Sequence, residues 1–182
     1  MSERVQLRDG STVTVRPASA LDEPLLLAFL EGLCADARRL RFFTAAADIS
    51  FAAHLALAEG AERYGLIAEN QAGRLVGHAN YVALDESCAE VAVEVADDLH
   101  GRGLGTILIE RLAAVAEGAG IARFVAEVLP ENHQMLDVFH DGFDARMAFN
   151  EGTDSVEFAT ASWRLARERF EGGAGGPEGS GV

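Results

Sequence analysis

Residues 91–106 of this chain read VAVEVADDLHGRGLGT, a strand pattern that runs into an acidic turn, a glycine-rich loop and the start of a helix. Glycines occupy positions 101, 103 and 105. At a helix start the first backbone amides lack partners within the helix, and the helix dipole is positive there. Glycines also let the backbone approach an anion closely. The stretch therefore predicts a cradle for a phosphate or pyrophosphate group at the end of a strand.

Two other nucleotide-binding loops are excluded by their spacing. The dinucleotide fingerprint requires G-x-G-x-x-G, but here Gly103 is followed by Gly105, and position 106 is threonine. The nucleoside-triphosphate loop requires a lysine after its last glycine, and this chain contains no lysine at all. On the loop alone a third alternative stays open, in which the glycines merely form a turn between strand and helix.

The length and composition predict one globular domain. A chain of 182 residues with 49% hydrophobic residues is long enough to bury a core without disulfides or metals. It has neither an apolar run of ~20 residues nor a secretory signal pattern, so we expect a cytoplasmic protein without membrane contact. Cys34 and Cys88 lie far apart and indicate buried, reduced thiols. We expect the domain to cover residues 1–171 and the glycine-rich residues 172–182 to form a disordered tail.

The net charge of -14 limits the class of partner. Binding to a phosphate backbone depends on clustered basic residues, so nucleic acid is not an expected partner. An acidic surface would raise the local concentration of cationic ligands, such as amines and lysine-bearing proteins. Alternatively, the acidity serves only solubility.

The periodicity predicts an α+β fold with a mixed, mostly antiparallel central sheet flanked by helices. Alternating apolar residues indicate strands over residues 13–16, 64–69, 75–84, 90–95, 124–129, 146–150 and 156–160. Helical spacing indicates helices over residues 20–32, 36–42, 51–59, 104–118 and 132–141. Arg38, Arg39 and Arg41 are expected on a solvated face, or else near an anionic cofactor. Tyr64 and Tyr81 are expected to pack within the sheet.

The loop from His100 to Gly105 resembles R/Q-x-x-G-x-G/A, the pyrophosphate loop of the GNAT superfamily of N-acetyltransferases, with His100 at the first position. The resemblance covers residues 13–158 in the same order of elements. The stretches LRDGS, LRFF, AEVA and VLPEN, which begin at residues 7, 40, 89 and 128, are similar to the GNAT domains of bacterial Pat-type protein lysine acetyltransferases. In that family the domain is often joined to a regulatory module, and none is visible in this chain.

The resemblance implies acetyl-CoA as cosubstrate and a set of contacts to it. The strand end would pair with the pantetheine arm and hold the thioester carbonyl, and the loop would hold the pyrophosphate through backbone amides. Asn132 corresponds to an asparagine that contacts the cofactor arm, although it could equally be a plain N-cap. The expected cofactor-binding residues are Val93, Glu94, Val95, His100, Gly101, Arg102, Gly103, Leu104, Gly105, Thr106 and Asn132.

Glu90 is the expected catalytic base, because it resembles the glutamate on the central strand of protein-acetylating GNAT enzymes. A lysine amine has a reference pKa of about 10.4, so removing its proton at pH 7 costs ~4.6 kcal/mol, and a carboxylate can accept that proton. Glu94 lies on the same strand face by alternation, and two carboxylates there would raise each other's pKa. Alternatively, both side chains simply face solvent.

Neither a general acid nor a metal is assigned. Many relatives have a tyrosine seven residues after the asparagine, which protonates the leaving thiolate, but that position is Phe139 here. His133 and His140 are seven residues apart on one predicted helix, but no third metal ligand is evident.

The resulting hypothesis is an acetyl-CoA-dependent N-acetyltransferase. The acceptor is expected to be a lysine of a protein such as an acyl-CoA synthetase, which attacks acetyl-CoA directly in a ternary complex. Two alternatives stay open: acetylation of a small amine, and a non-catalytic acyl-CoA-binding sensor.

Overall fold

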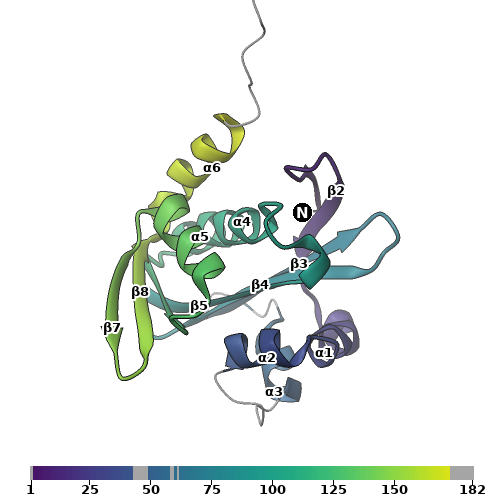
Figure 1. Cartoon of the computed structure of the whole chain (residues 1–182), viewed down its shortest axis with the longest axis horizontal. Coiled ribbons are helices and arrows are strands. Elements are labelled where there is room, and N and C mark those ends of the chain that lie inside the picture. Colours follow the sequence, from purple (N-terminus) through teal and green to yellow (C-terminus); the bar gives the residue numbers. More distant parts are fainter. Residues whose placement is uncertain (1, 43–48, 58–59, 61, 173–182) are drawn as a thin grey trace, which may run out of the picture.

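The computed structural model describes residues 2–42, 49–57, 60 and 62–172. Its elements follow the chain as mapped in Figure 1. The strands are β1 Glu3–Gln6, β2 Thr12–Pro17, β3 Arg63–Asn70, β4 Leu75–Ala83, β5 Cys88–Val95, β6 Arg123–Val128, β7 Arg146–Asn150 and β8 Thr153–Ala159. The α-helices are α1 Glu23–Glu31, α2 Ala35–Phe42, α3 Ile49–Leu55, α4 Leu104–Gly118, α5 His133–Phe143 and α6 Trp163–Gly172.

The described strands form one eight-stranded sheet with the order β1-β2-β3-β4-β5-β6-β8-β7. All neighbouring pairs are antiparallel except β5 and β6, which run parallel because α4 connects them across one face of the sheet. The mixed, mostly antiparallel sheet predicted from the sequence is confirmed. Strands β5 and β6 pair only over Cys88–Glu90 of β5, and beyond this point the sheet divides between them.

Helices cover both faces of the sheet. Figure 1 shows α4, α5 and α6 on one side and α1, α2 and α3 on the other. The core under α4 includes Leu104 and Leu108, and the core under α1 includes Leu26 and Leu30 with Ile67 of β3. Residues of β3 alternate between the two cores, which explains why this strand is apolar over consecutive positions.

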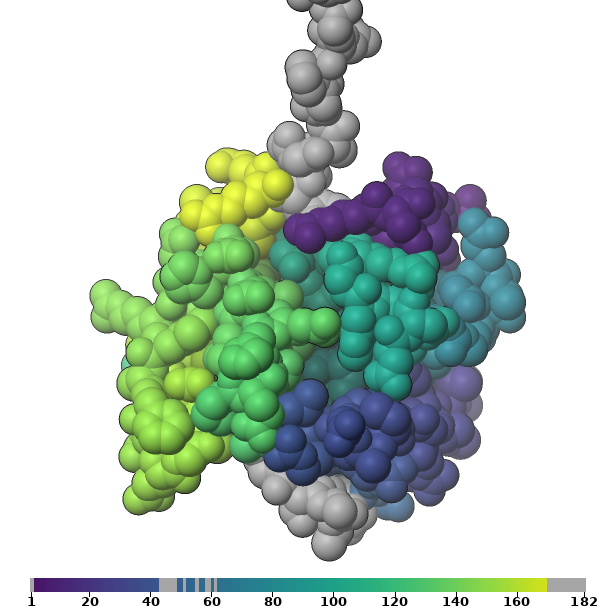
Figure 2. Space-filling view, viewed as in Figure 1, coloured from purple at the N-terminus to yellow at the C-terminus, as the bar shows by residue number. Residues whose placement is uncertain are grey.

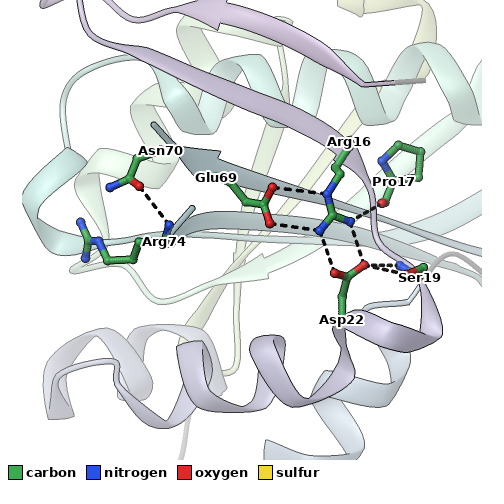
Figure 3. Close-up of polar contacts among 7 residues, drawn as sticks. All are labelled: Arg16, Pro17, Ser19, Asp22, Glu69, Asn70 and Arg74. Carbon is green, nitrogen blue, oxygen red and sulfur yellow. Dashed lines mark hydrogen bonds and ion pairs between the residues drawn. The ribbon is translucent and has the colours of Figure 1, made fainter. Parts of the chain in front are cut away.

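An ion cluster fixes the start of α1 to the sheet (Figure 3). Arg16 of β2 donates to both carboxylate oxygens of Asp22, from Nη1 to Oδ2 at 2.8 Å and from Nη2 to Oδ1 at 2.7 Å. Its Nη2 also lies 3.0 Å from Glu69 Oε1 on β3. The Ser19 amide and hydroxyl both donate to Asp22 Oδ2 at 2.8 Å. The helices below the sheet are therefore attached to β2 and β3 by a buried carboxylate.

A close backbone contact fixes the other end of this helical layer. A Cβ atom at Gly65 of β3 would lie 1.6 Å from the carbonyl oxygen of Ala56, which directly follows α3. Only glycine allows the chain after α3 to lie this close to the sheet.

The sequence missed two elements, β1 and α6, and placed several ends differently. The predicted helix over residues 51–59 is α3, which ends at Leu55, and residues 58–59 are outside the described part. Gly172 belongs to α6 rather than to the predicted tail, whose remaining residues are not described. Cys88 is buried as expected, but Cys34 is exposed. Among the described residues no helix is long and apolar enough to cross a membrane.

Candidate active site

The central feature of the site is a fork between β5 and β6. The two strands pair at Cys88 with Arg123, Ala89 with Phe124 and Glu90 with Val125. Beyond Glu90, β5 stays paired with β4 as far as Val95, but on its other side it has no strand partner within the described chain. Backbone N–H and C=O groups of a strand point alternately to its two sides. Some of those between residues 91 and 95 therefore face the fork, where an extended ligand could bind them.

The glycine loop lies directly after this free strand edge. Helix α4 begins at Leu104, and its N-cap is Gly103, with a φ of 86° in the left-handed region. Gly101 has a φ of 73°, and a Cβ there would meet open space. No described residue accepts a hydrogen bond from the backbone amides of residues 101–106. The loop thus presents a row of free amides at a positive helix end, as a pyrophosphate group requires.

Both features open into one cavity of about 610 Å³, a size that suits a small-molecule ligand. Its walls come from α4, α5 and α6 above the sheet and from α2 below it. Figure 2 shows the surface hollowed between the green α5, the teal loop before α4 and the blue α2. The cavity therefore reaches through the fork from one face of the sheet to the other, and two substrates could enter from opposite sides.

Nearly all the predicted site residues are brought together here. Those that line the cavity are Glu90, Val93, Glu94, Val95, His100, Gly101, Gly103, Leu104, Gly105, Thr106 and Asn132. The exception is Arg102, which is not part of the lining and pairs with Asp9 in the turn after β1. His100 lines the cavity, and its ring also contacts the strand before the loop. Its Nε2 lies 2.9 Å from the Val95 carbonyl oxygen and fastens the loop to the end of β5.

Glu90 lies at the branch point of the fork. It is the last residue of β5 that pairs with β6, and its side chain is exposed to the cavity. This position puts a carboxylate next to the free strand edge that begins at Val91. A group held along that edge would therefore have a proton acceptor beside it.

Glu94 lies on the same strand face as Glu90, as predicted, but its carboxylate is already paired. It forms an ion pair with Arg41 of α2 through Oε1, and its Oε2 lies 2.9 Å from His78 Nδ1 on β4. The two carboxylates are therefore not equivalent. Of these two, Glu90 is the one exposed for proton transfer.

The structure decides against a solvated face for Arg41. The sequence left this residue either on such a face with Arg38 and Arg39 or near an anionic cofactor, and it lines the cavity and contacts Glu94. Burial lowers the pKa of Arg41 to about 10, an effect that the Glu90 carboxylate opposes, so the guanidinium remains charged at pH 7. The helical spacing of Ala37 and Leu40, which also line the cavity, could have indicated this position, because Arg41 lies four residues after Ala37 on the same face of α2.

The far wall comes from α5. Asn132 is the N-cap of this helix, and its Oδ1 accepts a hydrogen bond from the Met135 amide at 3.3 Å. The plain N-cap interpretation therefore holds, while the amide group of the same side chain stays available to the cavity that it lines. Phe139 lies on the cavity side of α5 with its ring against Phe158, so this position supplies no acid.

Two further arginines at the cavity were not singled out from the sequence. Arg8 follows β1, and its amide donates to the Arg102 carbonyl oxygen at 3.1 Å, which places it next to the glycine loop. Arg169 lies on α6, a helix that the sequence did not predict. Within the described residues, no cluster of three or more potential ligands could hold a metal ion.

Comparisons with known proteins agree with this geometry. A sequence profile of the acetyltransferase (GNAT) family matches residues 30–143. The crystal structure of the GNAT domain of S. lividans PAT has a TM-score of 0.75 and 33% identity, over 87% of this chain and 96% of that chain. A cAMP-binding acyltransferase from Mycobacterium smegmatis has a TM-score of 0.63 at 23% identity, over 92% of this chain and 55% of that chain, which indicates a similar fold.

One curated relative is similar over a shorter region. Acetyltransferase Pat of Mycolicibacterium smegmatis is 36% identical over 75 residues, which make up 40% of this chain and 22% of that protein. The matched region is thus only about a fifth of that relative's length.

Proposed function

Because this chain belongs to the acetyltransferase (GNAT) family, we propose that it transfers the acetyl group of acetyl-CoA to a lysine side chain of a protein, with Glu90 as the base. One observation carries this proposal: β5 and β6 part directly after Glu90, so a carboxylate stands where a free strand edge opens into the cavity.

The geometry of the cavity supports acetyl-CoA as the donor. The free amides of residues 101–106 would bind the pyrophosphate, and the unpaired edge of β5 up to Val95 would bind the amide groups of the pantetheine arm. Thiolate departure from this cosubstrate needs no metal. We therefore expect turnover to be unaffected by a metal chelator.

The chemical step follows from this placement. The acceptor amine enters from the α2 side and attacks the thioester carbonyl carbon, so that a C–N bond forms and the C–S bond breaks. Glu90 accepts one proton of the lysine ammonium, the second proton that the nitrogen loses as the amide forms goes to water, and CoA leaves as the thiolate. Holding amine and thioester together in one cavity supplies much of the rate enhancement, because attack becomes effectively unimolecular.

The acceptor is proposed from the relatives and from the charge of the chain. The GNAT domain of S. lividans PAT is similar over most of this chain, and a protein lysine, for example of an acyl-CoA synthetase, is the acceptor class that such relatives suggest. A net charge of -14 favours the approach of a cationic lysine. We place this reaction in the cytoplasm.

Replacement of Glu90 by glutamine tests the base. General-base catalysis contributes about 10²- to 10⁴-fold, so we expect Glu90→Gln to lower kcat by that factor at pH 7 with saturating amine. The loss should shrink as the pH rises to 10, where about 30% of the amine is already neutral. A matched control is Glu157→Gln, an exposed glutamate of β8 outside the cavity, which should keep its rate. An unchanged kcat for Glu90→Gln would show that Glu90 is not the base.

Labelled acetyl-CoA tests the acceptor. We expect transfer to acyl-CoA synthetases and faster turnover with folded lysine proteins than with free amines. Transfer to polyamines or amino acids alone would replace the protein acceptor by a small amine. Micromolar binding of acetyl-CoA without turnover on any amine would instead indicate a sensor.

A further inference from the structure

A buried polar chain lies below the sheet next to the fork. It runs from His78 of β4 through Glu94 of β5 to Arg41 of α2. His78 is 1% exposed and Glu94 is 6% exposed. Burying a carboxylate is costly unless it is paired and hydrogen-bonded, so this chain needs a role that offsets its cost.

The protonation states in this chain follow from burial. Burial, together with the nearby Arg41 charge, lowers the pKa of His78 to about 3, so the ring is neutral at pH 7. A carboxylate can only accept, and therefore the Nδ1–H of His78 donates to Glu94. Glu94 in turn balances the guanidinium of Arg41. The chain from His78 to Arg41 carries no net charge, and its Arg41 guanidinium also interacts with the nearby Glu90 carboxylate.

Apolar packing holds α2 only in part. Ala37 and Phe42 are half-buried against the core below the sheet, and no side chain of this helix, all of whose residues are described, is fully buried. Two of its arginines instead reach the two arms of the fork: Arg41 pairs with Glu94 on β5, and Arg39 pairs with Glu131, which follows β6, at 2.6 Å. The Arg39 pair is about half exposed and contributes little. The Arg41 pair is thus the main attachment of α2 across the fork.

We propose that Arg41 is a positioning residue of the acceptor site, which Glu94 and His78 hold across the fork so that α2 and Glu90 enclose the incoming amine. The inference rests on the proposed function of Glu90, and it assigns α2 as the wall of the acceptor site next to that residue. In Figure 2, the blue α2 borders the recess from below, with the green α5 on the left of the recess and the teal loop before α4 on the right. Arg41 affects the amine by holding α2 in place through Glu94, whereas acetyl-CoA binds at the loop before α4.

The test uses variants that leave no buried charge unpaired. Arg41→Gln/Glu94→Gln removes both charges and retains an acceptor for His78, and Arg41→Lys keeps the charge but changes its reach. Arg38→Gln is the matched control, because Arg38 lies on the same helix and donates to the Glu31 carbonyl oxygen away from the cavity. Each variant is made with Glu90 and with Glu90→Gln, and kcat and KM are measured for both substrates.

We expect the double variant to lower kcat/KM for the amine by about 10- to 100-fold, with KM for acetyl-CoA within about twofold of the parent. Arg41→Lys should lose less, about three- to tenfold, and Arg38→Gln should match the parent. In the Glu90→Gln background, the double variant should lower kcat/KM for the amine by less than about twofold further, because the effects of residues that act as a unit are not additive.

Several results would overturn the proposal. One is an amine kcat/KM within twofold of the parent, measured on the double variant or, where that variant does not fold, on Arg41→Lys. Another is a further loss of about 10- to 100-fold in amine kcat/KM when the double variant is combined with Glu90→Gln. That result would show that Arg41 acts independently of Glu90, while the proposed function would stand. If Glu90→Gln itself has no effect, the proposed base and the positioning role fail together.

Discussion

Substitution of Asp22 by asparagine is expected to destabilise the chain strongly while leaving the chemistry alone. Asp22 is 7% exposed and accepts four hydrogen bonds, two from Arg16 and two from Ser19. Removing one partner of a buried ion pair costs about 3 to 5 kcal/mol. Arg16 is partly exposed and keeps Glu69, so the lower end applies, about 3 kcal/mol. For a chain of 182 residues this loss lowers Tm by about 6 to 12 °C.

The pH dependence gives an independent check of the same cluster. The Arg16 guanidinium, with the Ser19 donors, holds the pKa of Asp22 well below its usual range. A carboxylate whose pKa is depressed in the folded state stabilises the fold. Its full contribution is present above the unfolded-state pKa of about 3.9 and is lost as the pH falls. At pH 3 the parent should therefore have lost about 1 kcal/mol of this contribution. The difference in free energy of unfolding between the parent and Asp22→Asn should be smaller by that amount than at pH 7.

Urea denaturation, followed by the fluorescence of Trp163, the single tryptophan, measures both effects. Ser19→Ala is the control, because it removes one hydroxyl donor and keeps the ion pair, at a cost of about 1 kcal/mol. At a temperature well below Tm, kcat should be unchanged in both variants. A loss below 1 kcal/mol for Asp22→Asn at pH 7, or a gap that does not narrow at pH 3, would refute the reasoning.

Three further substitutions test the cofactor end and the scaffold. Gly103→Ala imposes a left-handed φ on an L residue, at about 1 to 2 kcal/mol, and should raise KM for acetyl-CoA about tenfold in steady-state kinetics; an unchanged KM would contradict the amide cradle. His100→Ala should raise that KM less than about fivefold, since backbone amides carry the site, and a hundredfold rise would give the ring the larger share. Gly65→Ala places a Cβ atom against the Ala56 carbonyl oxygen and should cost more than about 3 kcal/mol in urea unfolding, whereas a cost below 1 kcal/mol would mean that α3 shifts freely.

The geometry of the cofactor end, the part of the cavity from Val91 to Thr106 where we propose that acetyl-CoA binds, could be predicted from the sequence because it is local. The strand, the glycines and the helix that form it are continuous from Val91 to Thr106, so spacing alone constrains their geometry. The positive φ of Gly101 and Gly103 follows from residue type. The predicted helix over residues 104–118 is α4 to the residue. In this stretch, from Val91 to Thr106, the local sequence pattern and the observed structure agree.

The acceptor end could not be predicted in the same way. Arg41, His78 and Glu94 lie on three elements that only the tertiary fold brings together. In the sequence Arg41 is grouped with Arg38 and Arg39 by charge. In the fold Arg38 donates to the Glu31 carbonyl oxygen, whereas Arg39 pairs with Glu131 and Arg41 pairs with Glu94. Helix α6 posed a related problem, since it has few apolar residues and contacts α4 through ion pairs of Arg164 with Glu117 and of Arg167 with Glu110.

The two ends of the cavity therefore tolerate different changes. The cofactor end is built from backbone atoms, so His100 can replace the arginine or glutamine that the loop pattern has at this position without removing the amides that would bind the phosphates. The acceptor end is built from side chains on α2, β4 and β5, and a change at any one leaves a buried charge or donor unpaired in the others. A change of acceptor that preserves folding should thus require paired substitutions, such as Arg41 together with Glu94. Acetyl-CoA binding should survive these paired substitutions. The contacts that we propose for it come from backbone atoms of residues 101–106 and of β5, which a change of the Arg41 and Glu94 side chains leaves in place.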